Sequence, residues 1–236
     1  MEIKTRVTGE ERRLSILESA RPLFADKGFS GTSVRAIARA ANVSEALLYK
    51  HFSSKDELYK EVQIYPEKIQ LLLMDGLEKI EPGTEKLILI IYLAFHQIVL
   101  EVPGHQEEQK IHERLMFQSL LEDGSYARKA FKILLRGKGL RMVLESFEAA
   151  EQSGHLVDIP IPMENRLWFS HHLAMALNLC HLKGESVFEY HGSLEALVEQ
   201  AAFFALRGMG LSDVSMKAFF KPYHLKKMKQ QFFKNI

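Results

Sequence analysis

The amino-acid sequence predicts an all-α fold. Apolar residues recur at the three- and four-residue intervals of a helix along most of the chain, and no convincing strand alternation or hairpin signal interrupts them. Capping residues and glycines mark where these periodic segments begin and end. With 236 residues and a hydrophobic content of 47%, the chain is long enough and apolar enough to bury a core in one large or two modest domains.

The N-terminal residues predict several short helices close together. Residues 8 to 11 have the spacing of a capping box, and Gly28 should end the first helix. We expect Thr32 to cap a second helix and Ser44 to cap a third, with Asn42 in a left-handed turn between them. Helices of this size, separated by so few residues, are what a helix-turn-helix requires.

Longer helices are expected after this region. Residues 54 to 57 have capping-box spacing and open a fourth helix, which Pro66 should kink or interrupt. The remaining predicted helices cover Leu87 to Leu100 and residues of about 107–121, 126–152, 164–182, 193–208 and 223–234. We therefore expect a helix-turn-helix domain at residues 1–60, joined by the fourth helix to a helical domain at residues 61–236. The second domain ends in a basic helix at about 213–236.

The charges are divided unevenly along the chain, although the formal net charge is only +1. Residues 1–60 hold eleven Lys and Arg against eight Asp and Glu, residues 61–212 hold fourteen against twenty-one, and residues 213–236 hold six against one. A mildly basic N-terminal domain is compatible with nucleic-acid binding, because Lys and Arg supply affinity by neutralising phosphates.

The cysteine content and the N-terminal sequence indicate a cytoplasmic protein. Cys180 is the only cysteine, so no intrachain disulfide can form, and the charged N-terminus lacks the apolar core of a secretory signal. The longest apolar stretch, Leu87 to Leu100, is too short to span a bilayer. We expect no membrane association and no cofactor.

Many residue types recur at fixed spacing between roughly residues 10 and 60. They are Gly28-Phe29, Thr32-Ser33-Val34, Ile37-Ala38, Ala41-Asn42-Val43-Ser44, Leu48-Tyr49, His51-Phe52 and Lys55-Asp56-Glu57-Leu58. Together they resemble the N-terminal DNA-binding domain of the TetR family. The resemblance implies a homodimeric transcriptional regulator rather than an enzyme. It would bind double-stranded operator DNA, most often as a repressor released by a small-molecule effector.

Four residues of this domain are expected to contact DNA phosphates. Thr32 and Lys55 stand next to predicted helix N-termini, where free amides and the helix dipole favour an anion. The resemblance assigns the same role to Tyr49 and His51. Partly buried packing is the alternative for Tyr49 and His51, and Thr32 can serve as an N-cap at the same time. Contacts of this kind fix register on the duplex without distinguishing sequences.

Base contacts are expected from the short third helix, which can enter a major groove. The residues are Ser44, Glu45, Ala46, Leu47 and Lys50. Glu45 could accept from a cytosine amine, Leu47 could touch a thymine methyl and Lys50 could meet guanine. Glu45 and Leu47 depart from the commonest family pattern, and Glu45 could equally do no more than favour the helix N-terminus.

The resemblance also assigns roles in the second domain. Residues 164–182 and 193–208 resemble the last two long helices of TetR-family proteins, which pair with their copies as a four-helix bundle. The predicted interface residues are Trp168, Ala174, Leu177, Leu197, Ala201 and Ala205. Packing within one chain is the alternative for each.

An effector cavity is expected between the middle helices of the second domain. The candidate lining residues are Phe95, His96, Met116, Phe117, Leu120, Met142, Phe147 and His171. Because few charges converge among them, the favoured effector is mainly apolar or aromatic. The alternative is plain core, since aromatic and methionine side chains at helical spacing commonly fill one.

Two further functional classes remain open. His171, His172, Cys180 and His181 suggest a metal or enzymatic site, but adjacent histidines diverge on a helix and no carboxylate completes the set. The basic C-terminal helix carries Leu225, Met228 and Phe232 on one face and lysines elsewhere, as a helix at a membrane surface would. The same pattern fits a terminal helix packed on an acidic domain, which we favour.

Overall fold

The structure is a computed structural model that describes residues 8–62, 74–100, 106–181 and 186–234, with the side chains of residues 133–136 left undescribed. Apart from one isolated antiparallel bridge between Leu156 and Leu211, these residues form helices, turns and loops. The all-α prediction is therefore confirmed. The helices belong to two compact units, which are described separately.

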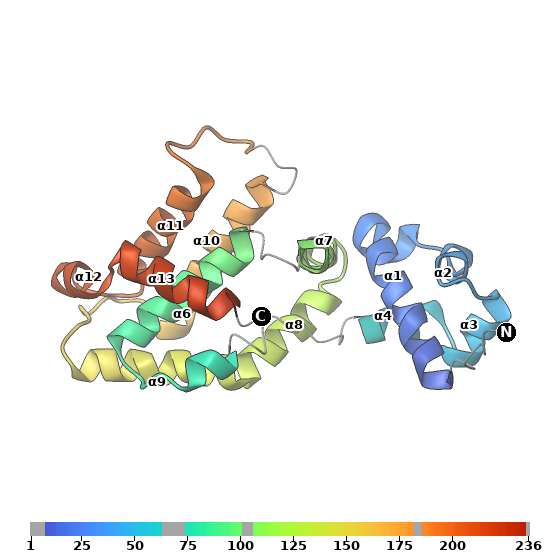
Figure 1. Cartoon of the computed structure of the whole chain (residues 1–236), viewed down its shortest axis with the longest axis horizontal. Coiled ribbons are helices and arrows are strands. Elements are labelled where there is room, and N and C mark those ends of the chain that lie inside the picture. Colours follow the sequence, from blue (N-terminus) through green and yellow to red (C-terminus); the bar gives the residue numbers. More distant parts are fainter. Residues whose placement is uncertain (1–7, 63–73, 101–105, 182–185, 235–236) are drawn as a thin grey trace. The chain divides into compact units, whose positions relative to one another are not determined.

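Unit 1 combines residues 1–67 with residues 107–136. Its helices are α1 (Gly9–Gly31), α2 (Val34–Ala40), α3 (Glu45–His51), α4 (Lys55–Val62), α7 (Gln106–Leu121) and α8 (Ser125–Arg136) (Figure 1). Two ion pairs join α7 to α1, namely Arg21 with Glu108 at 3.8 Å and Arg114 with Asp26. This grouping is wider than the N-terminal domain expected from the sequence, whose boundary at residue 60 stays a prediction.

Helix α1 begins where the sequence predicts but ends later. The Thr8 hydroxyl accepts from the Glu11 amide at 3.2 Å, and the Glu11 carboxylate accepts from the Thr8 amide at 2.7 Å, which completes the predicted capping box. Gly28 has φ +66°, a left-handed conformation that glycine adopts at little cost. Helical structure resumes after Gly28 and ends at Gly31, so Gly28 breaks the helix without ending it.

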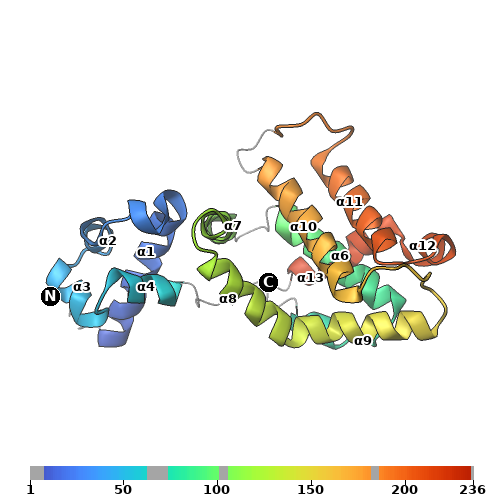
Figure 2. The same ribbon diagram turned by 180° about the vertical axis from the view of Figure 1, so that it is seen from behind.

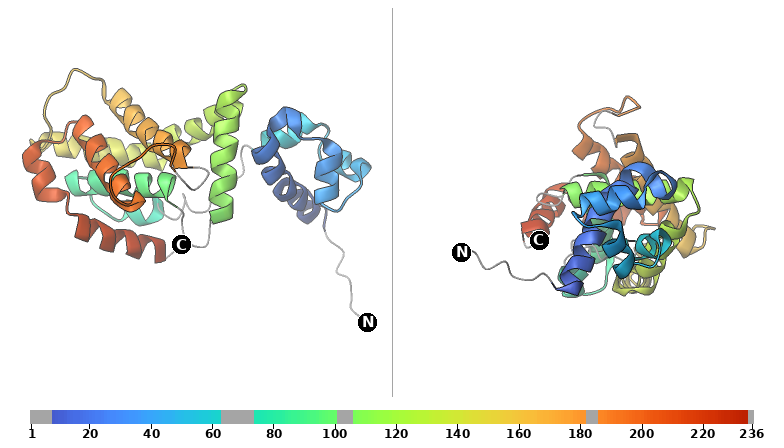
Figure 3. Two further views of the ribbon diagram at one scale, coloured as in Figure 1. Left: turned by 90° about the horizontal axis from the view of Figure 1, so that it is seen from above. Right: turned by 90° about the vertical axis from the view of Figure 1, so that its right-hand side faces the viewer.

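Unit 2 is built around α6, a helix that is buried on nearly every side. The helices of this unit are α6 (Thr84–Val99), α9 (Lys138–Gln152), α10 (Met163–His181), α11 (Leu194–Gly208), α12 (Asp213–Phe219) and α13 (Pro222–Lys234). Helix α6 contacts each of the other five. A helix that is apolar all round needs such cover, and α6 contains most of the apolar segment that the sequence predicts from Leu87 to Leu100. Figure 2 shows α10 in front of α6 with α9 along the lower side, and Figure 3 shows α13 running beside α6.

Two expectations about the elements change. The single helix predicted at about 126–152 is two helices, α8 and α9, because Gly137 between them has extended backbone (φ −90°, ψ −179°). The basic helix expected at about 213–236 is likewise two helices, α12 and α13, and Ser212 caps α12 by accepting from the Ser215 amide at 3.1 Å. Pro66 lies outside the described residues.

Among the described residues, no helix combines the length and apolar character that crossing a bilayer requires.

Candidate nucleic-acid interface

The turn between α2 and α3 has the tight geometry that the sequence predicts. Asn42 has φ +54°, and it is the only non-glycine residue with positive φ in the part of the chain that the structure describes. The Val43 amide donates to the Ala38 carbonyl at 2.9 Å, closing the turn. The Ser44 hydroxyl accepts from the Leu47 amide at 3.1 Å and so caps α3, as predicted. The turn thereby fixes the direction in which α3 leaves α2.

Helix α3 is held by a small apolar core beneath it. Leu48 and Phe52 are fully buried, together with Ile37 of α2. The Arg13 guanidinium lies 4.6 Å above the Phe52 ring and also pairs with Glu61, which links α1 to both α3 and α4. This packing gives α3 a single orientation within unit 1.

The opposite side of α3 is open. The residues predicted to contact bases have exposed side chains, with Leu47 half-buried: Ser44, Glu45, Ala46, Leu47 and Lys50. Tyr49 is 49% exposed and His51 is half-buried. The structure therefore brings these side chains together on one short helix, and the base and phosphate contacts assigned to them stay predictions.

Thr32 lies at the end of α1 and does not cap α2. Its buried hydroxyl donates to the carbonyl oxygens of Gly28 at 2.8 Å and Leu23 at 3.0 Å. Ser33 caps α2 instead, because its hydroxyl accepts from the Ala36 amide at 3.2 Å. The predicted N-cap was one residue early, since the left-handed Gly28 lengthens the end of α1 and draws Thr32 into it.

Lys55 also lies at the end of α1. Its ammonium donates to the carbonyl oxygens of Phe29 at 2.8 Å and Thr32 at 3.0 Å, and stands 4.1 Å from the centre of the Phe29 ring. These contacts place a positive charge at a helix C-terminus, where the dipole favours it. An ammonium has three protons, so one remains for the phosphate contact that stays predicted for Lys55.

The cap of α4 differs in part from the predicted capping box. The Ser54 hydroxyl accepts from the Glu57 amide at 3.1 Å, as expected. The Glu57 carboxylate, however, accepts from the amide of Ser53 at 2.6 Å and from its hydroxyl at 2.5 Å, instead of returning to Ser54. These hydrogen bonds to Ser53 lower the pKa of Glu57 below its ordinary value.

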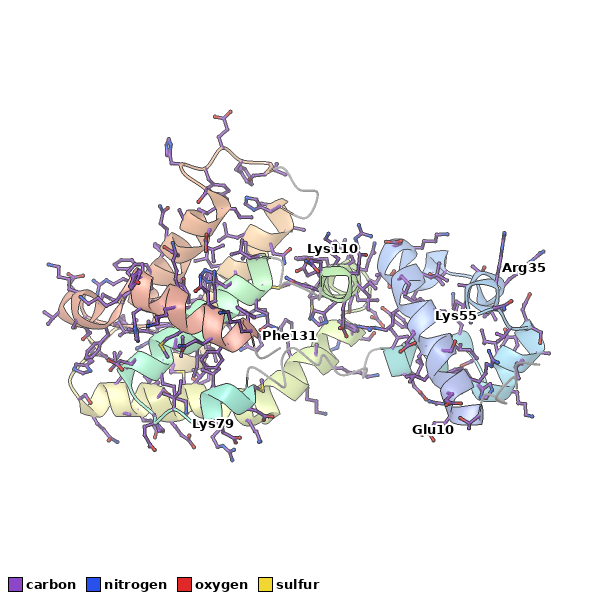
Figure 4. All side chains as sticks on the ribbon, viewed as in Figure 1. Glu10, Arg35, Lys55, Lys79, Lys110 and Phe131 are labelled. Carbon is purple, nitrogen blue, oxygen red and sulfur yellow. The ribbon has the colours of Figure 1, made fainter. Side chains whose placement is uncertain are left out.

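Two arginines of α2 belong to this surface and were not among the predicted site residues. Arg35 and Arg39 are exposed, and neither forms an ion pair within the residues that the structure describes. Figure 4 shows Arg35 pointing away from the helices, whereas Lys55 lies among them. Their position on the helix before the turn was the available signal, because that helix borders the phosphate backbone when the next one occupies a groove.

A family model for bacterial regulatory proteins of the tetR family matches residues 16–62, which contain α2, α3 and the turn between them. Residues 16–62 therefore form a TetR-family DNA-binding domain. This match agrees with the expectation that the chain is a regulator and not an enzyme.

Relatives and solved structures extend this similarity beyond α4. The chain is 29% identical to the HTH-type transcriptional regulator AcrR of Shigella flexneri over 151 residues, covering 64% of this chain and 66% of that protein, just under two thirds of its length. NalD, described as the secondary repressor of the MexAB-OprM multidrug efflux pump in Pseudomonas aeruginosa, has a similar structure (TM-score 0.59, 22% identity, 87% of this chain and 100% of that one). The transcriptional regulator FadR of Bacillus subtilis, solved in complex with stearoyl-CoA, also has a similar structure. The match has a TM-score of 0.56 and 17% identity, and it covers 83% of this chain and 98% of that one. Both share the fold.

The TetR-family resemblance also predicted effector-binding residues, and these belong to different units. Met116, Phe117 and Leu120 lie on α7 of unit 1, where Leu120 is exposed. The other five lie in unit 2: Phe95 and His96 on α6, Met142 and Phe147 on α9, and His171 on α10. Burial lowers the pKa of both His96 and His171 to about 4, so both imidazoles are neutral at pH 7.

The predicted interface residues of α10 and α11 have little surface left for a partner. Ala174, Leu177, Ala201 and Ala205 are buried in the apolar core of unit 2, and only Trp168 and Leu197 are half-buried. Other apolar side chains of the same two helices are exposed instead: Phe169, Leu179, Phe203 and Phe204. The alanines belong to the same buried core as the side chains of α6, where small side chains permit close helix packing.

Helix α13 packs on unit 2 in the manner favoured from the sequence. Leu225 is buried, and Met228 and Phe232 pack against the same core. Lys226 pairs with Glu199 at 3.1 Å and Lys229 pairs with Glu195 at 3.0 Å. The apolar face that a membrane-surface helix would need is therefore already covered.

The histidines of α10 do not form the metal site considered from the sequence. The rings of His171 and His172 meet edge to face with centroids 5.8 Å apart, and the His181 Nδ1 bonds to the Leu177 carbonyl at 2.7 Å. Within the described residues, the group with metal-ligand spacing is a different one, consisting of His96, Glu195 and Glu199. The sequence does not predict this group, because His96 lies on α6 and both glutamates lie on α11, about a hundred residues later.

Proposed function

We propose that this TetR-family chain is a cytoplasmic, homodimeric repressor that binds a palindromic operator through α3 and is released by a small, mainly apolar effector. The operator half-sites would lie one or more helical turns apart, about 34 to 36 Å per turn. The similarly folded NalD is a repressor, which supports repression over activation for this chain.

The open side of α3 carries the proposal. Lys50 is exposed on α3, and Arg35 and Arg39 are exposed on α2, without an ion-pair partner among the described residues. A rigid, capped helix with unpaired cations beside it suits a major groove flanked by phosphates. The exposed cations supply affinity for the phosphates, while the side chains of α3 supply discrimination between base sequences.

Part of the core of unit 2 supports an apolar effector. Ser146 lies on α9 between Met142 and Phe147, is fully buried, and its hydroxyl has no hydrogen-bond partner within the described residues. An unpaired hydroxyl among apolar side chains suits a ligand with an apolar body and one polar group. The stearoyl-CoA bound by the similarly folded FadR has such an acyl chain.

Selection of bound sequences from random DNA tests the operator half of the proposal. The selected site should be palindromic, and Lys50→Ala should weaken discrimination at one position per half-site by about 1 to 3 kcal/mol, the worth of a good base contact. Lys79→Ala is the matched control, because Lys79 is an exposed lysine of unit 2 and should leave binding unchanged. If no DNA sequence is enriched, the proposal fails.

Fluorescence of Trp168, the only tryptophan of the chain, tests the effector half. Fatty acids, acyl-CoA compounds and planar aromatics are titrated into the protein, and those that alter the emission are added to the operator complex. An effector should lower operator affinity by its preference for the DNA-free conformation. Unchanged operator affinity with every bound ligand would refute sensing and leave DNA binding intact.

A further inference from the structure

Three side chains from two helices of unit 2 converge around one position. A nitrogen of His96 on α6 and one carboxylate oxygen each of Glu195 and Glu199 on α11 lie within 4.8 Å of one another. The two glutamates are four residues apart, so one helical face presents both carboxylates. Imidazole and carboxylate groups together form a ligand set that divalent transition metals, zinc above all, prefer.

The tautomer of His96 leaves one nitrogen available. His96 is only 2% exposed, and its Nδ1 lies 2.8 Å from the Tyr92 carbonyl, which can only accept a hydrogen bond. The proton therefore belongs on Nδ1, and Nε2 carries the lone pair. Nε2 is buried and has no hydrogen-bond partner within the described residues. A backbone carbonyl that orients the imidazole through Nδ1 is the usual support of a metal-binding histidine.

The carboxylates are at present neutralised by lysines of α13. The Lys226 ammonium lies 3.1 Å from Glu199 Oε1 and the Lys229 ammonium lies 3.0 Å from Glu195 Oε1, while the Tyr92 hydroxyl donates to Glu199 Oε1 at 3.3 Å. All three contacts use Oε1, so Oε2 of both glutamates is left for a ligand. A divalent cation would replace the two ammonium charges without changing the net charge of the cluster.

We propose that His96, Glu195 and Glu199 form a binding site for a divalent transition metal ion of the zinc type, and that binding displaces Lys226 and Lys229 from the carboxylates. Zinc bonds of 2.0 to 2.2 Å require ligand atoms about 3.4 Å apart, and the present atoms lie within 4.8 Å of one another, so the glutamates must move closer by at most about 1.4 Å. They are able to do so, because Glu195 is half-exposed and both side chains are long. A water molecule would complete a tetrahedral shell, and the exposed side of Glu195 gives the ion its way in.

Metal binding to the full-length protein, stripped with a chelator and titrated with Zn²⁺ by calorimetry, tests the proposal directly. We expect one ion per chain, and Co²⁺ in the same site should give the visible absorption of a tetrahedral complex. Glu199→Gln and His96→Gln should each lower the affinity at least about 100-fold, more than loss of an outer-shell contact. Glu164→Gln and His172→Gln, exposed on α10, are the matched controls and should bind as the natural protein does.

The lysines provide a test that impaired folding cannot imitate. Lys226→Met and Lys229→Met remove the competing cations, so each should raise the affinity for Zn²⁺ by several fold while circular dichroism remains unchanged. Unaltered affinity in the lysine variants would overturn the displacement. Unaltered affinity in Glu199→Gln and His96→Gln, or no saturable binding of either ion, would overturn the site. The titration needs no DNA, so its outcome is independent of the proposed function.

Discussion

At the scale of single residues, Lys55 connects the beginning of α4 to the end of α1. Its ammonium donates to two carbonyls at the end of α1, those of Phe29, which also accepts from the Thr32 amide at 3.4 Å, and of Thr32. The residue therefore stabilises the unit that carries the DNA-binding helix, whether or not its third proton meets a phosphate.

We expect Lys55→Met to lower the free energy of unfolding by about 2 kcal/mol, because hydrogen bonds to a charged donor are lost while the apolar stem is kept. Urea denaturation followed by circular dichroism measures the effect. Lys27→Met, at an exposed position of α1, is the control and should change stability little. Equal stability of the two variants would show that the Lys55 contacts contribute nothing.

His171 gives the stability a dependence on pH. Burial, with a smaller contribution from the charge of His172, lowers the pKa of His171 in the folded chain to about 4, against an ordinary value of 6.5. Between these values the unfolded chain binds a proton that the folded chain does not. His171 alone should therefore lower the free energy of unfolding by about 3 kcal/mol as the pH drops from 6.5 to 4, and contribute no pH dependence above 6.5.

The measurement is urea denaturation at a series of pH values. In His171→Gln the decline below pH 6.5 should be smaller than in the natural sequence, whereas His172→Gln, at an exposed position, should keep most of it. If His171→Gln declines as steeply as the natural chain, the buried imidazole is not the group that takes up the proton.

The residues that the sequence predicts well are those whose partners are close in the chain. The caps by Thr8 and Ser44 and the left-handed Asn42 involve atoms no more than four residues apart, so local spacing determines them. Lys55 bonds to carbonyls more than twenty residues earlier, and His96 meets Glu195 from another helix. Local patterns contain no information about such pairs.

At the scale of elements, the length of α1 depends on Gly28. The residue breaks the helix with φ +66°, and an added Cβ atom would meet the carboxylate of Glu122, the residue directly after α7. At Gly137 helical structure is interrupted by extended backbone instead of a left-handed residue, and two helices replace the long one predicted from periodicity. Periodicity predicts helix across this segment but does not register the extended residue at which one helix ends before the next begins.

Gly28→Ala should destabilise unit 1 by roughly 1 to 2 kcal/mol, the cost of a left-handed conformation for a residue with a Cβ atom. Glu122 is exposed and flexible, so moving its carboxylate aside adds little. The double variant Gly28→Ala/Glu122→Ala should therefore be about as unstable as Gly28→Ala by thermal denaturation. Recovery of full stability in the double variant would instead identify the contact with Glu122 as the cause.

At the scale of the whole molecule, the exposed aromatic residues of α11 bear on assembly. Phe204 is 70% exposed and Phe203 lies beside it, although solvent-facing helix positions are usually polar. We expect these side chains to form the centre of the dimer interface in place of the alanines, which the core of unit 2 already uses. The interface on α10 and α11 stays a prediction, and the sequence does not choose between the faces of α11, because both carry apolar residues.

Phe204→Glu should convert the dimer to a monomer at micromolar concentration, because a charge would be buried at the centre of the interface. Light scattering gives the molar mass. Val214→Glu places the same charge at a 78% exposed position of α12 and should leave the dimer intact. A natural protein that is monomeric at this concentration would contradict the proposed assembly itself.

Unit 1 is discontinuous in the sequence, because residues 68–106 of unit 2 separate its two parts. During synthesis, α1 to α4 leave the ribosome well before α7, which supplies Glu108 and Arg114 to Arg21 and Asp26 of α1. The DNA-binding unit is therefore completed only after residue 136 has emerged. For the same reason, recombination at a single junction near residue 67 would give α1 an α7 from another protein. An exchange of the intact DNA-binding unit between relatives needs further junctions on either side of residues 107–136.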